Sequence, residues 1–314
     1  MTSSDNKTWT GTFTPAINAE DDNNTLSLAT TYTDLAGNNG PAETTANYEV
    51  DTLAPTVSSV AITDAAGVQN SFVNTGDNVS VTATFSETVI VDNRSANNPA
   101  LTLGVGSDNR TATYASGSGS TPLGFQYTIQ AGETDADGIS IEANTLALNS
   151  GTIRDAAGNN ATITYSAVSA NTSYKVDNTA PSVDNFTLSD TALKAGDNAT
   201  VTLVFSEAVA SFSSAADITV ANGALATMSS ADNVTWAGTF TPTANTEDDN
   251  NTLSLATSYT DTAGNAGPAE TTATILNRVC WRYLQLLKNY RLILKKSQRW
   301  LNQLKQMMLS QMER

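Results

Sequence analysis

The sequence predicts an all-β protein of tandem antiparallel β-sandwich modules, followed by an amphipathic helical tail. Three observations support this fold class. The segment Thr8–Ala46 recurs as Thr235–Ala273 with 32 of 39 positions identical, and short runs of alternating apolar residues stand between turn sequences. The composition also changes abruptly near Leu276. A repeat indicates structural modules, and short alternating runs indicate strands.

The repeat and two junction sequences divide the chain. VDTLAP begins at Val50 and VDNTAP begins at Val176, and each marks the start of a new module. No sequence ahead of Thr8 matches the front of the last module, so we expect a fragment of a longer repeat protein; no signal peptide follows Met1. The expected parts are the C-terminal half of a module (1–50), a complete module (51–176), a second complete module (177–276) and the tail (277–314).

The alternating runs place strands inside these modules. Val201, Leu203 and Phe205 share one face of Thr200–Glu207, and Val79–Glu87 repeats the arrangement. Gly, Asn, Asp and Pro clusters between such runs supply turns and interrupt any helix. Short strands with turns every 8 to 12 residues or so, in modules of about 100 residues, are typical of an antiparallel sandwich.

The repeated segment contributes two further strands. Trp236 and Phe240 alternate on the first, and Thr252–Thr260 forms the second. Because Trp9 and Trp236 both lie on alternating strands, we expect both indole rings to pack in a core.

Composition excludes several functions. The chain has no histidine and one cysteine, so triads with an imidazole base, His-ligated zinc and an intrachain disulfide are all excluded. Residues 1–276 contain 6 basic and 30 acidic side chains, whereas residues 277–314 contain 9 basic and 1 acidic. An acidic repeat region disfavours nucleic acid, which is bound by clustered Lys and Arg. We expect a protein that is not an enzyme and binds no nucleic acid.

Four motifs in a fixed order resemble the bacterial immunoglobulin-like (Ig-like) repeats of large surface adhesins of the biofilm-associated, RTX-exported type. The resemblance covers residues 1 to about 275. It implies tandem Ig-like domains in an extracellular, calcium-stiffened stalk at the cell surface. The motifs are V-D-x-x-A-P, F-S-E-x-V at Phe85 and Phe205, D-x-A-G-N at Asp34, Asp155 and Asp261, and T-W-x-G-T-F-T-P.

The strand order of such a sandwich predicts where the motif carboxylates lie. The start of strand A, the B–C loop and the F–G loop share one pole. With strand B at Ala199–Phe205 and strand F at Thr252–Thr260, Glu207 and Asp261 join Asp177 at that pole. By the same reasoning the first junction gathers Asp51, Glu87 and Asp155 with the loop 20–22, while Asp135 and Asp137 of GETDADG face the second junction.

These carboxylates predict calcium sites at the module junctions. Like charges about 4 Å apart cost ~1 kcal/mol per pair even in water, and calcium, which takes six to eight oxygen ligands, removes that cost. A second role is open for the aspartates of D-x-A-G-N, which cap turns through Asx hydrogen bonds. For the acids of residues 20–22 the alternative is a solvated loop that does not bind the ion.

The tail interrupts the repeat where a last strand is expected. Its apolar side chains recur at helical spacing among Lys and Arg, which predicts a basic amphipathic helix with too many charges to span a bilayer. Our preferred interpretation is a shifted reading frame near Thr274; membrane contact is expected only if the tail is genuine. The apolar positions are Trp281, Leu284, Leu287, Tyr290, Leu294, Leu301, Leu304 and Met308.

The sequence leaves two alternative functions for the chain. The first is a non-catalytic stalk segment of a secreted adhesin that supports cell adhesion or biofilm formation, with neighbouring modules of the parent chain as its partners. The second is a binding module whose loops recognise a carbohydrate or protein of a host or matrix surface. Near-identical copies favour the stalk, because loops that read a ligand are expected to diverge.

Overall fold

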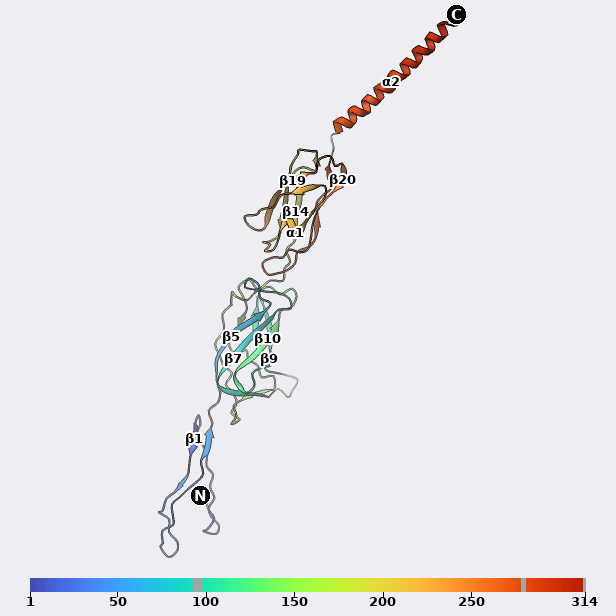
Figure 1. The fold of residues 1–314 in the computed structure, drawn as a ribbon. Coiled ribbons are helices and arrows are strands. Elements are labelled where there is room, and N and C mark those ends of the chain that lie inside the picture. Colours follow the sequence, from blue (N-terminus) through green and yellow to red (C-terminus); the bar gives the residue numbers. More distant parts are fainter. Residues whose placement is uncertain (93–97, 278–280, 313–314) are drawn as a thin grey trace. The chain divides into compact units, whose positions relative to one another are not determined.

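The structure is a computed structural model that describes residues 1–92, 98–277 and 281–312 (Figure 1). It divides into two compact units, Met1–Asn178 and Thr179–Arg314. Strands dominate both, which confirms the all-β prediction. The strands of the first unit are β1 (Glu20–Asn24), β2 (Ser27–Leu28), β3 (Glu43–Thr44), β4 (Tyr48–Asp51), β5 (Val57–Ala66), β6 (Phe72–Val73), β7 (Asn78–Asp92), β8 (Ala100–Val105), β9 (Asp108–Ser116), β10 (Ser120–Thr128), β11 (Ser140–Ile141), β12 (Thr152–Arg154) and β13 (Lys175–Val176).

The first fifty residues form two narrow antiparallel ribbons, β1 with β4 and β2 with β3. Their apolar side chains are mostly exposed. Trp9, expected in a core, has 55% of its surface exposed, so that expectation was wrong. The reason is that Phe212, against which its copy Trp236 packs, has no counterpart beside residues 1–50 among the described residues.

Residues 57–176 enclose a hydrophobic core. Strand β7 pairs with β5, β10 and β12, and β8, β9 and β11 extend the sheet in the order β11-β8-β9-β10-β7-β12. Strands β6 and β13 form a separate parallel pair. In the first half of β7 every second residue is buried, as the alternation predicts: Val79, Val81, Ala83 and Phe85. These side chains belong to one cluster with Leu101, Leu103, Leu123, Phe125, Ile139, Ile141 and Ile153.

The second unit is a sandwich whose strands pair antiparallel, except for the parallel pair β15 and β23. One sheet has the order β14-β16-β19-β18, and β17-β21-β22 and β15-β23-β20 form two smaller sheets. Its elements are β14 (Val183–Leu188), β15 (Ala192–Leu193), β16 (Ala199–Phe205), α1 (Ser214–Asp217), β17 (Ile218–Val220), β18 (Gly223–Leu225), β19 (Thr235–Pro242), β20 (Asp248–Asn251), β21 (Leu253–Leu255), β22 (Glu270–Thr271), β23 (Ile275–Asn277) and α2 (Trp281–Met312).

The core of the second unit lies between these sheets. Val201, Leu203 and Phe205 of β16 pack in one cluster with Leu253 and Leu255 of β21. Strand β21 is much shorter than the strand predicted over residues 252–260. The buried Tyr259 is instead held by its turn, where its hydroxyl donates to the carbonyl of Pro268 at 2.9 Å. Burial raises the pKa of Tyr259 to about 12, and the nearby carboxylates of Glu270 and Asp217 act in the same direction.

The C-terminal tail forms one helix, α2, as its apolar spacing predicts. Tyr290, Trp300, Leu301 and Met308 are exposed along it. The side chains of residues 281–289, including Trp281, Leu284 and Leu287, lie outside the described residues, as does Cys280. Within the described part of the chain, no helix is both long enough and apolar enough to cross a membrane.

Candidate metal centres

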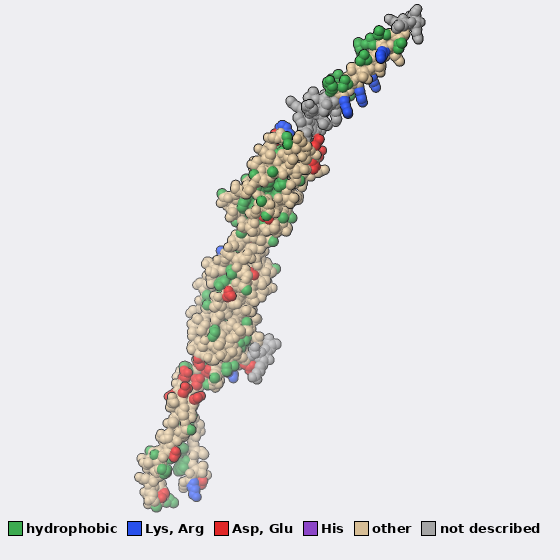
Figure 2. Space-filling view, viewed as in Figure 1, with side chains coloured by type: hydrophobic (Ala, Val, Ile, Leu, Met, Phe, Trp, Pro, Cys, Tyr) green, Lys and Arg blue, Asp and Glu red, His purple; other side chains and the backbone are tan. Residues whose placement is uncertain are grey.

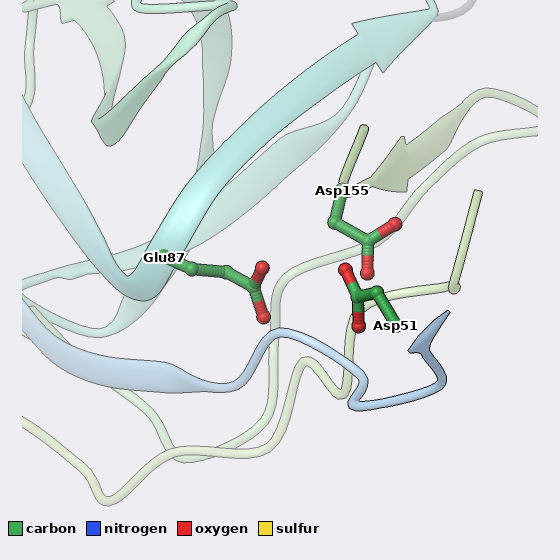
Figure 3. Close-up of side chains that lie close together, drawn as sticks. All are labelled: Asp51, Glu87 and Asp155. Atoms are coloured by element: carbon green, nitrogen blue, oxygen red, sulfur yellow. The ribbon is translucent and has the colours of Figure 1, made fainter. Parts of the chain in front are cut away.

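Three predicted carboxylates come together in the first unit. Asp51, Glu87 and Asp155 each offer one carboxylate oxygen, and the three oxygens lie within 4.8 Å of one another. The side chains come from separate segments and point toward a common space (Figure 3). Two of them are half-buried, and Asp155 is buried. The structure therefore brings together residues that are 36 to 104 positions apart in sequence.

The pairing of β7 explains this convergence. Arg154 pairs with Ile90, so Asp155 follows β12 directly beside β7. Glu87 lies on β7 where the pairing with β10 shifts, so the strand is irregular there. On the other side, the backbone NH of Thr56 donates to the Ser86 hydroxyl at 3.0 Å, and the Ser86 NH donates to the Thr56 carbonyl at 2.8 Å. These bonds fix the segment that follows Asp51 beside Glu87.

Asp155 keeps one acceptor position open while it caps its turn. Its Oδ1 accepts the backbone NH groups of Gly158 at 2.7 Å and Asn159 at 2.8 Å, and its Oδ2 accepts the Asn159 side-chain amide at 2.7 Å. A carboxylate offers about four lone pairs. Within the described part of the chain, Oδ2 thus has a lone pair available for a cation. The turn role and the ligand role are compatible.

Asn159 is a residue that the sequence reasoning missed. Its amide nitrogen donates to Asp155 and also lies 3.4 Å from Oδ1 of Asp51, so it bridges two of the carboxylates. An amide donor offsets part of their repulsion when no cation is bound. The signal was present, because the last residue of all three D-x-A-G-N motifs is Asn.

Electrostatics show that the carboxylates affect one another. Partial burial raises the pKa of Glu87 above its ordinary value, and the negative charges of Asp155, Asp51 and Glu20 raise it further. Glu20 belongs to this group through the pairing of β1 with β4, where its Cα lies opposite that of Asp51. Acidic side chains gather visibly in this part of the first unit (Figure 2). A positive ion here would relieve the repulsion among these carboxylates.

Replacing Glu87 with glutamine is expected to stabilise the first unit in calcium-free buffer at neutral pH. The gain is about 1 kcal/mol or less, because the group lies near solvent. The folded-state pKa of Glu87 is raised, so its ionised carboxylate destabilises the folded state above that pKa. This destabilisation disappears as the pH falls through it. Urea unfolding of both proteins in chelator checks this, with the exposed Glu142→Gln as control. A gain that persists at acid pH would contradict the electrostatic cause.

The second unit repeats part of this arrangement. The carboxylate oxygens of Glu207 and Asp261 lie within 4.8 Å of each other. A bridge between Val209 and Asp261 aligns the two segments, and the Ser206 and Ser182 backbones pair as those of Ser86 and Thr56 do. By sequence, Asp177 is the counterpart of Asp51, and it precedes this unit. Its role as a third ligand stays a prediction.

Asp135 and Asp137 are not brought into either group. Asp135 is buried, and its two oxygens accept the backbone NH groups of Gly138 at 2.8 Å and Gly106 at 2.9 Å. Asp137 is exposed. The neighbouring Glu133 is buried and paired with Arg110. Asp135 and Glu133 hold their own loops in place, and the clustering expected of GETDADG at a metal site is absent from the described contacts.

The geometry of the first group fits a hard divalent cation. Calcium binds oxygen at roughly 2.3 to 2.6 Å, so two ligands of one ion stand at most about 5 Å apart, and the observed 4.8 Å lies within this limit. All three donors are carboxylate oxygens, the ligand type that calcium prefers over imidazole or thiolate. Asp51, Glu87 and Asp155 could thus hold such an ion.

Comparison with known proteins finds one family model that matches part of the chain. A model described as "Bacterial Ig-like domain" matches residues 1–50 and 177–276. No curated protein matches the chain. Similar solved structures include the Escherichia coli adhesin FdeC, with 12% identity, a TM-score of 0.36 and coverage of 84% of this chain and 87% of that chain. The titin I9–I11 tandem has 8% identity, a TM-score of 0.27 and coverage of 70% and 66%. The plexin A4 extracellular region has 7% identity, a TM-score of 0.26 and coverage of 71% and 27%.

The match agrees with the motifs that the two segments share. Residues 1–50 and 177–276 both carry the T-W-x-G-T-F-T-P strand and the D-x-A-G-N turn, and the second segment folds as the antiparallel sandwich described above. Residues 1–50 and 177–276 are therefore similar to bacterial Ig-like domains.

Proposed function

We propose that the chain is a non-catalytic stalk segment of a secreted bacterial surface adhesin, in which calcium bound at the module ends stiffens the chain. The observation that carries this proposal is the convergence of Asp51, Glu87 and Asp155 from three separate segments. The match of two segments to bacterial Ig-like domains supports the adhesin class.

A structural role explains the carboxylates better than catalysis does. Glu87 and Glu207 are the glutamates of the same F-S-E-x-V motif, and Asp155 and Asp261 begin the same D-x-A-G-N turn. A catalytic pair belongs to one cleft, whereas this pair recurs with the module. Recurrence at module ends is what a stalk requires, since each linker must resist bending.

Asp51 explains how an ion would act on the linker. It is the last residue of β4, which belongs to the half-module, whereas Glu87 and Asp155 belong to the following module. An ion that binds all three connects the end of one module to the loops of the next. It also removes the repulsion that raises the pKa of Glu87.

Calcium is expected to raise the midpoint of thermal unfolding. A free concentration 100 times the dissociation constant stabilises the folded state by about 2.7 kcal/mol, which corresponds to several degrees for a unit of this size. Melts of the full chain in calcium, in chelator and in magnesium measure this. Magnesium should act less, because it demands a near-ideal octahedral site. Identical melts in calcium and chelator would contradict the proposal.

Two further measurements separate the stalk from a ligand-binding module. Small-angle scattering should give a narrower range of end-to-end distances in calcium than in chelator. Saturable binding of the full chain to host cells or glycans would instead favour recognition by the loops.

A further inference from the structure

The helix α2 separates its apolar side chains from its basic ones. An α-helix turns by about 100° per residue, so the sequence gives the position of each side chain around the axis. In residues 290–310, apolar side chains gather within an arc of roughly 100° that we call the apolar face. The apolar face consists of Tyr290, Ile293, Leu294, Leu301, Leu304 and Met308.

The basic side chains lie outside the apolar face. Lys295 and Arg299 are on the opposite side of the helix, Arg291 and Lys305 are along one flank of the apolar face, and Lys296 is along the other flank. Figure 2 shows Lys and Arg along one side of α2 and apolar side chains along the other. From residue 281 to residue 312 the sequence has seven Lys or Arg and no Asp or Glu. The charge of the helix is therefore positive throughout.

The apolar face is open to solvent. Tyr290 and Ile293 are each 63% exposed, Leu301 is 59% exposed and Met308 is 65% exposed. These residues span five turns of one helix side. A contiguous exposed apolar surface of this kind marks a site of interaction with a protein or a membrane.

Other parts of this chain are poor occupants of the apolar face. A second α2 would bring two positive helices together without the acidic residues that pair such charges in coiled coils. The complete modules are acidic, but the large apolar side chains exposed on the described residues of 51–276 are few: Leu53, Val68 and Ile90. These modules offer charge without an apolar surface.

An anionic lipid bilayer offers both. Its headgroups attract Lys and Arg, and the boundary between headgroups and acyl chains accepts apolar side chains. Lys296 on one flank and Arg291 and Lys305 on the other can lay their aliphatic stems beside the apolar face while their charges reach the headgroups. The combination of a basic polar side and an apolar side with Leu and aromatic residues is typical of helices that lie in a membrane surface.

We propose that α2 binds the surface of lipid bilayers that carry anionic headgroups. The helix lies in the plane of the surface with the apolar face toward the acyl chains. The negative charge of the modules does not prevent this, because charges in water more than about 8 Å apart are largely screened at physiological ionic strength, and a 32-residue helix is about 48 Å long. Such binding is a property of the helix as it stands and does not require that the tail was selected for it.

Flotation of the full chain with vesicles tests the proposal. One set of vesicles is pure phosphatidylcholine and the other contains about 30% phosphatidylserine, both in chelator so that calcium cannot connect acidic modules to lipid. We expect partitioning into the anionic vesicles to be at least about tenfold stronger, and to weaken as salt is added. Equal partitioning into both kinds of vesicle, or none, would overturn the proposal.

Two neighbouring leucines provide a matched pair of variants. Leu294 belongs to the apolar face and is 49% exposed, whereas Leu292 is 58% exposed and lies on the opposite side of the helix. Leu294→Gln is expected to lower partitioning at least about fivefold, because the side chain no longer enters the apolar boundary. Leu292→Gln should change it less than about twofold.

Both variants should keep the helix, since Leu and Gln have similar helix propensities, and circular dichroism checks this. Equal losses of partitioning in the two variants would show attraction by charge alone and would contradict an inserted apolar face.

Two further measurements examine the other occupants. Polyglutamate is the probe for an acidic polypeptide: binding as tight as that to anionic vesicles, and weakened by Leu294→Gln, would assign the apolar face to a protein and overturn the proposal. Sedimentation velocity of the chain alone examines a second copy. A dimer that Leu294→Gln dissociates and that anionic vesicles leave intact would equally overturn it.

Discussion

Replacing Leu253 with alanine is expected to lower the free energy of unfolding of the second unit by about 2–5 kcal/mol. The side chain is fully buried in the cluster that contains Val201, Leu203 and Phe205. Its removal loses apolar burial and leaves a cavity that the facing sheets cannot close. Urea unfolding followed by the fluorescence of the half-buried Trp236 measures the change.

The repeat supplies a matched control for this substitution. Leu26 is the same residue at the same position of the first copy, with the same backbone bond to a threonine hydroxyl, but 51% of its surface is exposed. Leu26→Ala is expected to change stability by no more than about 0.5 kcal/mol. Losses of similar size in the two variants would show that the half-module has a core of its own.

These two leucines show where prediction from the sequence ends. Alternation alone places the buried faces of β7 and β16, because a strand exposes every second residue to the same side. It says nothing about whether another strand covers that face. Trp9 and Trp236 stand in nearly identical sequences, yet only Trp236 packs against a core. Burial belongs to the assembled sandwich and not to the segment.

For the acidic residues, too, the sequence predicts some features and not others. The convergence of Asp51, Glu87 and Asp155 could be predicted, because loop positions in a sandwich follow from strand order. The behaviour of Asp135 could not, because its two bonds to backbone NH groups depend on the detailed path of the loop. Spacing such as D-x-D-G does not distinguish a cation ligand from a carboxylate that holds its own turn.

The tail illustrates a different limit. Its helical spacing predicted α2, and the helix forms over Trp281–Met312. The same spacing does not say whether the segment was selected for a role. The DNA sequence of the gene tests the frameshift interpretation. Translated in another reading frame after Thr274, it is expected to encode a further V-D-x-x-A-P junction.

Replacing Asp155 with asparagine is expected to abolish most of the stabilisation of the first unit by calcium. The amide oxygen still accepts the backbone NH groups of Gly158 and Asn159, so the turn is retained. The substitution removes one of three converging charges from the cation and places an amide nitrogen where Oδ2 stood. At a calcium concentration that stabilises the unmodified chain by about 2.7 kcal/mol, the variant should gain well under half of that.

Asp34→Asn is the control that separates a ligand from a turn cap. Asp34 begins the same D-x-A-G-N turn and accepts the NH groups of Ala36 and Asn38 at 2.8 and 2.9 Å. The side-chain amide of Asn38 lowers the pKa of Asp34, and these backbone NH groups lower it further. Among the described residues, it belongs to no cluster of three carboxylates. Calcium should therefore stabilise this variant as much as the unmodified chain. If both variants lose the calcium effect equally, the turn itself is responsible; if neither does, the cation binds elsewhere and Asp155 only caps its loop.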